Sequence, residues 1–187
     1  MSDASSSTWP KTVYAKSLNP ADKLRPVSAL VVTASGTNPT VADRPDIWHW
    51  WLVAQLASSK DHAESEQEVS VTLDMIPANP PTGTMVVKSD GPALSKDVSL
   101  AQPETETDFT FLIPTIISPP PNLNDLIALI LSKGLDRYEF DDTGSGCVHW
   151  VVSVLELVEE TKWIEEGVTK KFVEQYYRTP YHRGTFY

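Results

Sequence analysis

The stretch SPPPNLNDLIALILSKG (118–134) marks the point at which the chain changes character. Three prolines end the preceding segment. Asn122 then stands where a helix N-cap is expected, with Asp125 three residues later. The apolar residues that follow recur at helical spacing, and Gly134 is typical of the position just after a helix end. The pattern predicts a helix that begins after Asn122 and ends before Gly134.

The segments before this helix have the patterns of strands. EVSVTLDM (68–75) alternates apolar and polar residues with period two, as a half-buried strand does. In DFTFLIPTI (108–116), Pro114 limits the strand to a sheet edge or a strand end. The other strand candidates are short and rich in β-branched or aromatic residues: PVSALVVTAS (26–35), DIWHWWLVAQLAS (46–58) and GTMVVKS (83–89).

Helical patterns return after residue 134, over residues 147–160 and 169–178. Strands that precede helices favour an α+β fold, with a mostly antiparallel sheet followed by two or three helices. Residues 1–20 are small, polar and interrupted by proline, so we expect a loose N-terminal arm. Residues 21–187 then form a single domain, since 187 residues suffice for one ordinary core.

Composition excludes several classes of function. A net charge of −10 with no basic stripe argues against nucleic-acid binding. The sequence contains no run of eighteen apolar residues, so we expect no membrane span. The Ser-rich N-terminus lacks the apolar core of a signal peptide. A single cysteine suits a reducing compartment, so we expect a cytoplasmic protein. Without a C-x₂-C pair or an H-E-x-x-H motif, we predict no metal and no other cofactor.

The single cysteine lies in GSGCVHW (144–150), at the predicted start of a helix. Cys147 shares the apolar side of that helix, so it faces the protein. Unpaired backbone N–H groups and the positive end of the helix dipole favour a thiolate at this position. Gly146 lets the backbone come close to a bound group, and the same N–H groups can hold an oxyanion. The alternative interpretation is an ordinary buried cysteine that only packs.

A reactive thiolate needs a base, which is usually histidine. His149 is turned about 200° around the helix from Cys147. His62 and His182 lie in a polar loop and in the C-terminal tail. His49 stands within an aromatic strand, where a polar ring needs a partner, so it is the candidate base or else a hydrogen-bonded core histidine.

A third group would orient the imidazole. Asp74, at the end of the neighbouring strand, is the candidate, because Gln55 lies about 20 Å from His49 along its own strand. Four tryptophans stand next to the proposed pair in the sequence and are candidate walls of a substrate pocket or else ordinary core: Trp48, Trp50, Trp51 and Trp150.

The order of these features resembles the circularly permuted papain-like proteins, in which the histidine strand precedes the cysteine helix. That group includes the lecithin:retinol acyltransferase-like enzymes and the permuted deubiquitinase-like peptidases. HWWLVAQL (49–56) and GCVHWVVSVLELVEE (146–160) carry the resemblance. The same stretches, with VSVTLDM (69–75) and RGTFY (183–187), also resemble a family of fungal proteins without an assigned activity.

The papain-like resemblance implies Cys147 as nucleophile, His49 as base and Asp74 as the third polar group. The implied activity is thiol-dependent acyl transfer or hydrolysis of a small-molecule or acyl substrate. Two departures are the glycine at 146, where acyltransferase-like members usually have asparagine, and aspartate at 74, where their third residue is often histidine. The alternative is a non-covalent protein whose aromatic pocket binds a small apolar molecule, or steers an isomerisation or cyclisation, in fungal specialised metabolism. A third interpretation is an interaction module with an inactive site.

Overall fold

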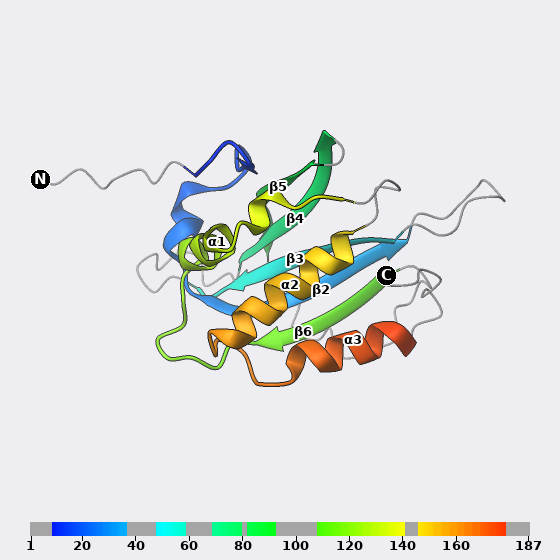
Figure 1. Cartoon of the computed structure of the whole chain (residues 1–187). Helices are drawn as coiled ribbons and strands as arrows, with labels where there is room; N and C mark the ends of the chain where they lie inside the picture. The colour runs from blue at the N-terminus through cyan, green and yellow to red at the C-terminus, as the bar shows by residue number, and fades with distance from the viewer. Residues whose placement is uncertain are drawn as a thin grey trace, which may run out of the picture.

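The structure is a computed structural model that describes residues 9–36, 48–58, 69–79, 82–92, 108–140 and 146–178 (Figure 1). Its strands are β1 (Val13–Tyr14), β2 (Val27–Gly36), β3 (Trp48–Leu56), β4 (Val69–Asn79), β5 (Thr82–Pro92) and β6 (Asp108–Pro114). Its α-helices are α1 (Leu123–Ser132), α2 (Cys147–Glu160) and α3 (Val168–Arg178). Two short 3₁₀ helices are η1 (Pro20–Leu24) and η2 (Leu135–Arg137).

The strands form one mixed sheet in the order β1-β5-β4-β3-β2-β6. Every neighbouring pair is antiparallel except β1 with β5, which is parallel. The three α-helices all follow the strands in the sequence. The prediction of an α+β fold with strands before helices is therefore confirmed, and Pro114 ends the edge strand β6 as expected.

One face of the sheet carries the apolar core beneath the helices. Along β3, Trp50, Leu52, Ala54 and Leu56 are all buried in this core, in the alternation that a strand imposes on its side chains. The helix α2 crosses the middle of the sheet, and α3 runs beside β6 (Figure 1). Phe172 of α3 packs its ring against β6 and against Trp50 of β3, so α2 and α3 cover the same face.

The N-terminal segment departs from the expected loose arm over its described part, residues 9–20. Val13 and Tyr14 pair with β5 as the parallel edge strand β1. Trp9 donates its indole N–H to Asn124 of α1 over 3.3 Å, and Leu18 is buried. The expectation is wrong for these residues because a few apolar side chains anchor an otherwise polar segment. Residues 1–8 lie outside the described residues.

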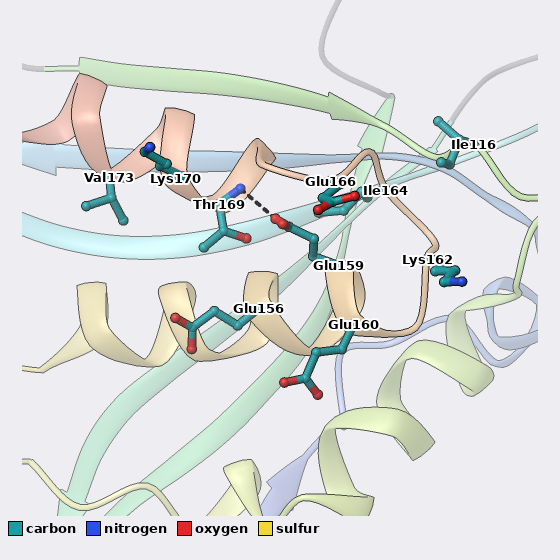
Figure 2. A pocket seen from close by; sticks show the side chains of 10 residues that line it. All are labelled: Ile116, Glu156, Glu159, Glu160, Lys162, Ile164, Glu166, Thr169, Lys170 and Val173. Carbon is teal, nitrogen blue, oxygen red and sulfur yellow. Dashed lines mark hydrogen bonds between the residues drawn. The ribbon is translucent and has the colours of Figure 1, made fainter.

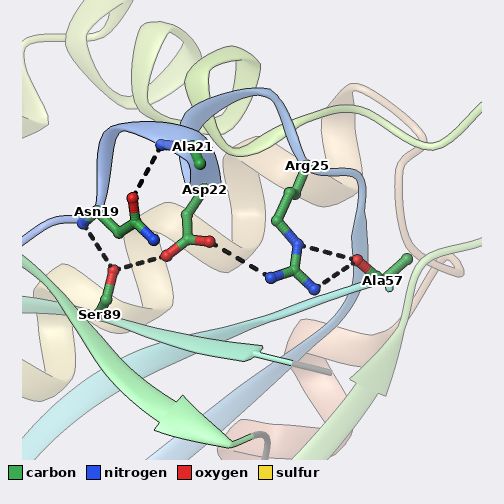
Figure 3. A network of polar contacts seen from close by, with 6 residues as sticks. All are labelled: Asn19, Ala21, Asp22, Arg25, Ala57 and Ser89. Atoms are coloured by element: carbon green, nitrogen blue, oxygen red, sulfur yellow. Dashed lines mark hydrogen bonds and ion pairs between the residues drawn. The ribbon is translucent and has the colours of Figure 1, made fainter. Parts of the chain in front are cut away.

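A polar network fixes η1 between two strands (Figure 3). The carboxylate of Asp22 is buried; it accepts a hydrogen bond from the Ser89 hydroxyl at 2.8 Å and lies 3.4 Å from the Arg25 guanidinium. Arg25 also donates twice to the carbonyl oxygen of Ala57, just after β3. A buried carboxylate is stable only with such partners, so the network ties η1 to β5 and to the end of β3.

A carboxylate takes part in capping two of the described α-helices, α1 and α3. Asn122 and Asp125 form a complete capping box at α1, as predicted. The carboxylate of Glu159 accepts from the backbone N–H groups of Gly167 and Thr169, at 2.7 and 2.8 Å, and so holds the start of α3. Glu159 lies near the end of α2 and acquires this role because α3 folds back onto α2.

In the part of the chain that the structure describes, no helix is both long enough and apolar enough to span a membrane.

Candidate active site

The site begins where two strands stop pairing with each other. The ladder between β3 and β4 runs from Leu56–Val69 to Leu52–Leu73 and includes no later pair. In the same register Asp74 would stand diagonally across from His49, within reach of a long side chain. The imidazole Nε2 of His49 lies 2.9 Å from Oδ1 and 3.0 Å from Oδ2 of Asp74. The predicted partnership between His49 and Asp74 is thus present as a side-chain contact between the strands.

The face of the imidazole rests on an aromatic ring. Trp51 stacks on His49 with ring centroids 5.4 Å apart and planes inclined by 27°. The two residues share a face of β3, as the period of the strand predicts. Both side chains are partly exposed, so the ring of His49 is fixed in orientation and remains open to solvent on one side. Trp51 and His49 therefore form one partly exposed pair of stacked rings.

The side chain of Cys147 reaches the same imidazole from the start of α2. Hydrogen bonds of His49 to Asp74 and to Cys147 raise the pKa of the imidazole from 6.5 to about 10; burial opposes the shift, and Coulombic attraction to both partners adds to it. Since Asp74 occupies Nε2, Nδ1 is the ring nitrogen left for the sulfur. The structure therefore brings together Cys147, His49 and Asp74, three residues from three different elements.

Gly146 shapes the start of α2 immediately before Cys147. Its φ of 143° is a conformation that glycine adopts without strain. A Cβ at this position would also lie 2.9 Å from Cε1 of Tyr138, which is too close for any other residue. Gly146, as the N-cap, has no side chain to cap the helix, and the first turn of α2 holds no acidic residue. Within the helix itself, therefore, no carboxylate offsets the positive end of the dipole where Cys147 stands.

Two of the four tryptophans predicted as pocket walls lie elsewhere. Trp150 is 0% exposed and donates its indole N–H to the carbonyl of Leu135 at 2.9 Å. Trp50 is 3% exposed and packs among the aromatic rings beneath α3. Both predictions as substrate contacts are wrong, because the alternation of β3 and the inward side of α2 turn these rings into the core. The side chain of Trp48 lies outside the described residues.

Two of the other candidate residues, His149 and Gln55, lie outside the site. His149 is exposed on α2, as its position two residues after Cys147 predicts. Gln55, the alternative orienting group, is buried opposite Ser70 at the far end of β3. His62 and His182 lie outside the described residues. Among those that are described, no group of three or more His, Cys, Asp or Glu side chains is arranged to hold a metal ion.

A cavity of about 1000 Å³ opens at the other end of α2, against α3 (Figure 2). The residues that line it include Glu156, Glu160, Ile164 and Lys170. The thirteen helical steps from Cys147 to Glu160 span roughly 20 Å, so this cavity is separate from the Cys147 site. Thr169 and Glu159 close one wall through the hydrogen bond that begins α3.

Comparison with known proteins places the chain in a family. Residues 29–187 match a family model described as a domain of unknown function (DUF7770), which spans most of the chain. The chain belongs to the DUF7770 family. The matched region contains His49, Asp74 and Cys147, whereas β1 and η1 precede it. No curated protein and no solved structure matches the chain.

Tyr138 of this DUF7770 protein lies against the site and is absent from the sequence-based predictions. Residues 136–140 (DRYEF) have only the pattern of a short extended piece, which gave no reason to choose the tyrosine. In the structure its ring lies against the Cα of Gly146 and meets the ring of Phe140 edge to face, with centroids 5.5 Å apart. The one available signal was the glycine at 146, which indicates that some other group comes close to the backbone there.

Proposed function

We propose that this protein is a thiol enzyme that transfers or hydrolyses acyl groups through a thioester on Cys147. The observation that carries the proposal is that one imidazole, that of His49, is hydrogen-bonded to both Cys147 and Asp74. A cysteine, a histidine and an orienting carboxylate are the groups that thiol acyl transfer needs. With the pKa of His49 raised to about 10, the ring is protonated at neutral pH and stabilises a thiolate beside it.

In the first half of the reaction the Cys147 thiolate attacks the carbonyl carbon of the substrate. A bond forms between sulfur and carbon, and the carbonyl oxygen becomes an oxyanion near the start of α2, where the helix dipole stabilises negative charge. The oxyanion collapses, the bond to the leaving group breaks, and the imidazolium of His49 gives its proton to that group. The products are an acyl thioester on Cys147 and a neutral imidazole held by Asp74.

In the second half a water molecule, or another acceptor with a hydroxyl or amine, attacks the thioester. His49 now removes the proton from the acceptor as a general base. The bond between carbon and sulfur breaks, so Cys147 leaves as a thiolate and the imidazolium is restored. Water as acceptor gives hydrolysis, and any other acceptor gives acyl transfer.

Trp51 supports an acyl substrate with an apolar or aromatic part. Its ring stacks on His49 and is partly exposed, so a substrate carbonyl that approaches Cys147 would pass along this aromatic surface. Such rings contribute large contact areas to ligand sites. A thiolate enzyme needs its cysteine reduced, which fits the proposed cytoplasmic location.

The competing proposal, a non-covalent aromatic pocket, has less support. Of its four proposed walls, Trp50 and Trp150 are core residues, and Trp51 alone has a described side chain that is partly exposed. A passive pocket also gives no reason for the imidazole of His49 to contact both Asp74 and Cys147. It predicts that removal of the sulfur leaves binding unchanged.

The decisive experiment uses p-nitrophenyl acetate as an acyl donor. We expect a burst of p-nitrophenolate and, by mass spectrometry of the quenched protein, one acetyl group on Cys147. Cys147→Ala should abolish both the burst and the acetyl group, with a loss of about a thousandfold or more in rate. Acetylation at other residues with turnover retained in Cys147→Ala would overturn the proposal.

Trp51→Ala tests the substrate surface in the same assay. We compare p-nitrophenyl acetate with p-nitrophenyl esters of longer acyl chains. The variant should lose its preference for the longer chains while it retains the burst with acetate, because the ring contacts the acyl group and not the sulfur. An unchanged preference would remove Trp51 from the substrate site and leave the role of Cys147 intact.

A further inference from the structure

The two edges of the sheet are built differently (Figure 1). One edge is β1, which is two residues long, and the ammonium group of Lys16 lies 5.6 Å from the ring centroid of Tyr14. Short strands and lysines both hinder an edge from pairing with a further strand. The other edge is β6, which is seven residues long, and no charged residue stands between Phe109 and Ile117. Only β6 therefore has the length and the composition of an edge that can accept another strand.

Exposed apolar side chains gather along β6 and the segment that follows it. The described part of the chain has five exposed large hydrophobic side chains, and three of them lie here: Leu112 (46%), Ile116 (53%) and Ile117 (38%). The helix α3 is anchored inward from this edge. The ring of Phe172 contacts both Trp50 of β3 and Phe111 of β6, so it lies above β2, the strand between them.

The backbone of β6 directs alternate residues away from the sheet. Thr115 donates its N–H to a carbonyl of β2 over 3.1 Å, whereas Ile116 donates to a carbonyl in the loop before α3 over 2.8 Å. In an antiparallel strand the N–H and C=O of one residue point to the same side, and successive residues alternate. Thr110 and Leu112 therefore direct their N–H and C=O groups outward, as Ile116 does. Among the described strands, none pairs with this side of β6.

These outward groups are arranged symmetrically about Phe111, the central residue of β6. An antiparallel copy of the strand, related by a two-fold axis at Phe111, would place Thr110 opposite Leu112 of the copy. It would also place Asp108 opposite Pro114 of the copy. Each N–H that β6 directs outward then meets a carbonyl, and the proline, which has no N–H, stands at the end of the ladder.

We propose that β6 pairs with β6 of a second copy of this chain, so that the two sheets join into one across a two-fold axis. Such an interface uses the same surface on both copies and must be self-complementary, as this edge is. Pairing would cover Leu112 with Thr110 of the other copy and bring the two Phe111 rings side by side, a favourable cross-strand pair.

Charge favours a second copy over a partner of a different kind. The chain has a net charge of −10, so two copies repel each other over most of their surfaces. The uncharged segment from Phe109 to Ile117 is where that repulsion is smallest. The same segment offers no charge by which an acidic or a basic partner could be selected.

Leu112→Pro tests the pairing by sedimentation velocity at micromolar concentrations. The wild-type chain should sediment as a dimer and the variant as a monomer, because proline removes an outward N–H and no hydrogen bond to β2. Phe111 already has the extended conformation that a following proline requires. Leu112→Val, which keeps the N–H, is the matched control and should remain a dimer. Circular dichroism and the melting temperature verify that both variants retain the fold.

The register is tested by disulfide formation in a Cys147→Ser background. An equal mixture of Thr110→Cys and Leu112→Cys chains should form a disulfide-linked dimer on mild oxidation, because the two positions face each other with Cα atoms about 5.5 Å apart. Either variant alone should not, since like positions lie two residues out of register, at roughly 8 Å, which is too far for a disulfide.

Each other outcome contradicts the pairing. A monomeric wild-type chain would overturn the second copy as occupant and leave the edge to a strand of another protein. A dimer that persists in Leu112→Pro would place the interface elsewhere on the molecule. Cross-linking of either single variant alone, or no cross-linking of the mixture, would refute the two-fold axis at Phe111.

Discussion

The starts of α1 and α2 are built in opposite ways. At α1, Asn122 and Asp125 exchange two hydrogen bonds of 2.9 and 3.0 Å, which satisfy the first backbone N–H groups and place a carboxylate at the positive end of the helix. At α2 the N-cap is Gly146, which has no side chain to cap the helix, and the first turn holds Cys147 in place of an acid.

The difference separates a helix start that is capped by side chains from one at which we propose that a thiolate reacts. In a capping box, side chains of the protein bind the first backbone N–H groups and offset the positive end of the helix dipole. At α2 the same potential falls on a sulfur that hydrogen-bonds to the protonated ring of His49. Side chains thus cap α1 and, through Glu159, α3. At α2, where we propose that a thiolate reacts, the N-cap is a glycine.

The largest expected effect is that of His49→Gln on the reactivity of Cys147 at the start of α2. At pH 6.5 an ordinary thiol is about 1% ionised, so loss of the imidazolium should slow the alkylation of Cys147 by iodoacetamide roughly 10- to 100-fold. His149→Gln, exposed two residues beyond Cys147, is the matched control and should leave the rate unchanged.

If His49 has only a structural role, the same substitution should change stability and not thiol reactivity. His49→Gln would then lower the melting temperature, because the partly buried Asp74 loses its hydrogen bond at a cost of about 1–3 kcal/mol at most, while the alkylation rate stays the same. In that case the starts of α1 and α2 would both be purely structural, and the proposed functional difference between them would be refuted.

A smaller effect is expected from Asp74→Asn, which keeps a hydrogen-bond acceptor and removes the charge. The hydrogen bond to Asp74 is the largest cause of the raised pKa of His49, so the variant should lower that pKa from about 10 by roughly 1–3 units. The titration is followed by the Cε1–H resonance of His49 in NMR spectra. An unchanged midpoint would show that Asp74 does not set the charge of the ring.

The same shift predicts a dependence of stability on pH. The folded-state pKa of His49 lies above the unfolded value of 6.5, so its contribution to stability is complete below 6.5 and is lost as the pH rises through about 10. The melting temperature of the wild-type protein should therefore fall more between pH 7 and 10 than that of Asp74→Asn. Parallel curves for the two proteins would contradict this linkage.

The smallest effect is expected from Asn122→Ala at the start of α1. Loss of the N-cap should lower the free energy of unfolding by about 1 kcal/mol, measured by urea denaturation. The alkylation rate of Cys147 should not change, because the capping box of α1 does not contact the site. A change in thiol reactivity would show that the two helix starts are coupled, and would contradict the assignment of a purely structural role to the capping box of α1.

Local patterns determined the elements of this protein and much of its candidate site. The capping residues around Asn122, the alternation in β4 and the helix that begins at Cys147 all appear at the predicted positions, because caps and periodicity act within a few residues. The choice of His49 and Asp74 also followed from local reasoning, since a polar ring within an aromatic strand requires a polar partner.

Only the tertiary structure decided which side chains surround those residues. Trp50 and Trp51 are neighbours in the sequence, yet the fold buries one beneath α3 and stacks the other on His49. Tyr138 and Glu159 acquire their contacts from Gly146 and from the start of α3. The physical reason is that such contacts depend on how strands and helices pack against one another in three dimensions. The local pattern of residue types does not specify that packing.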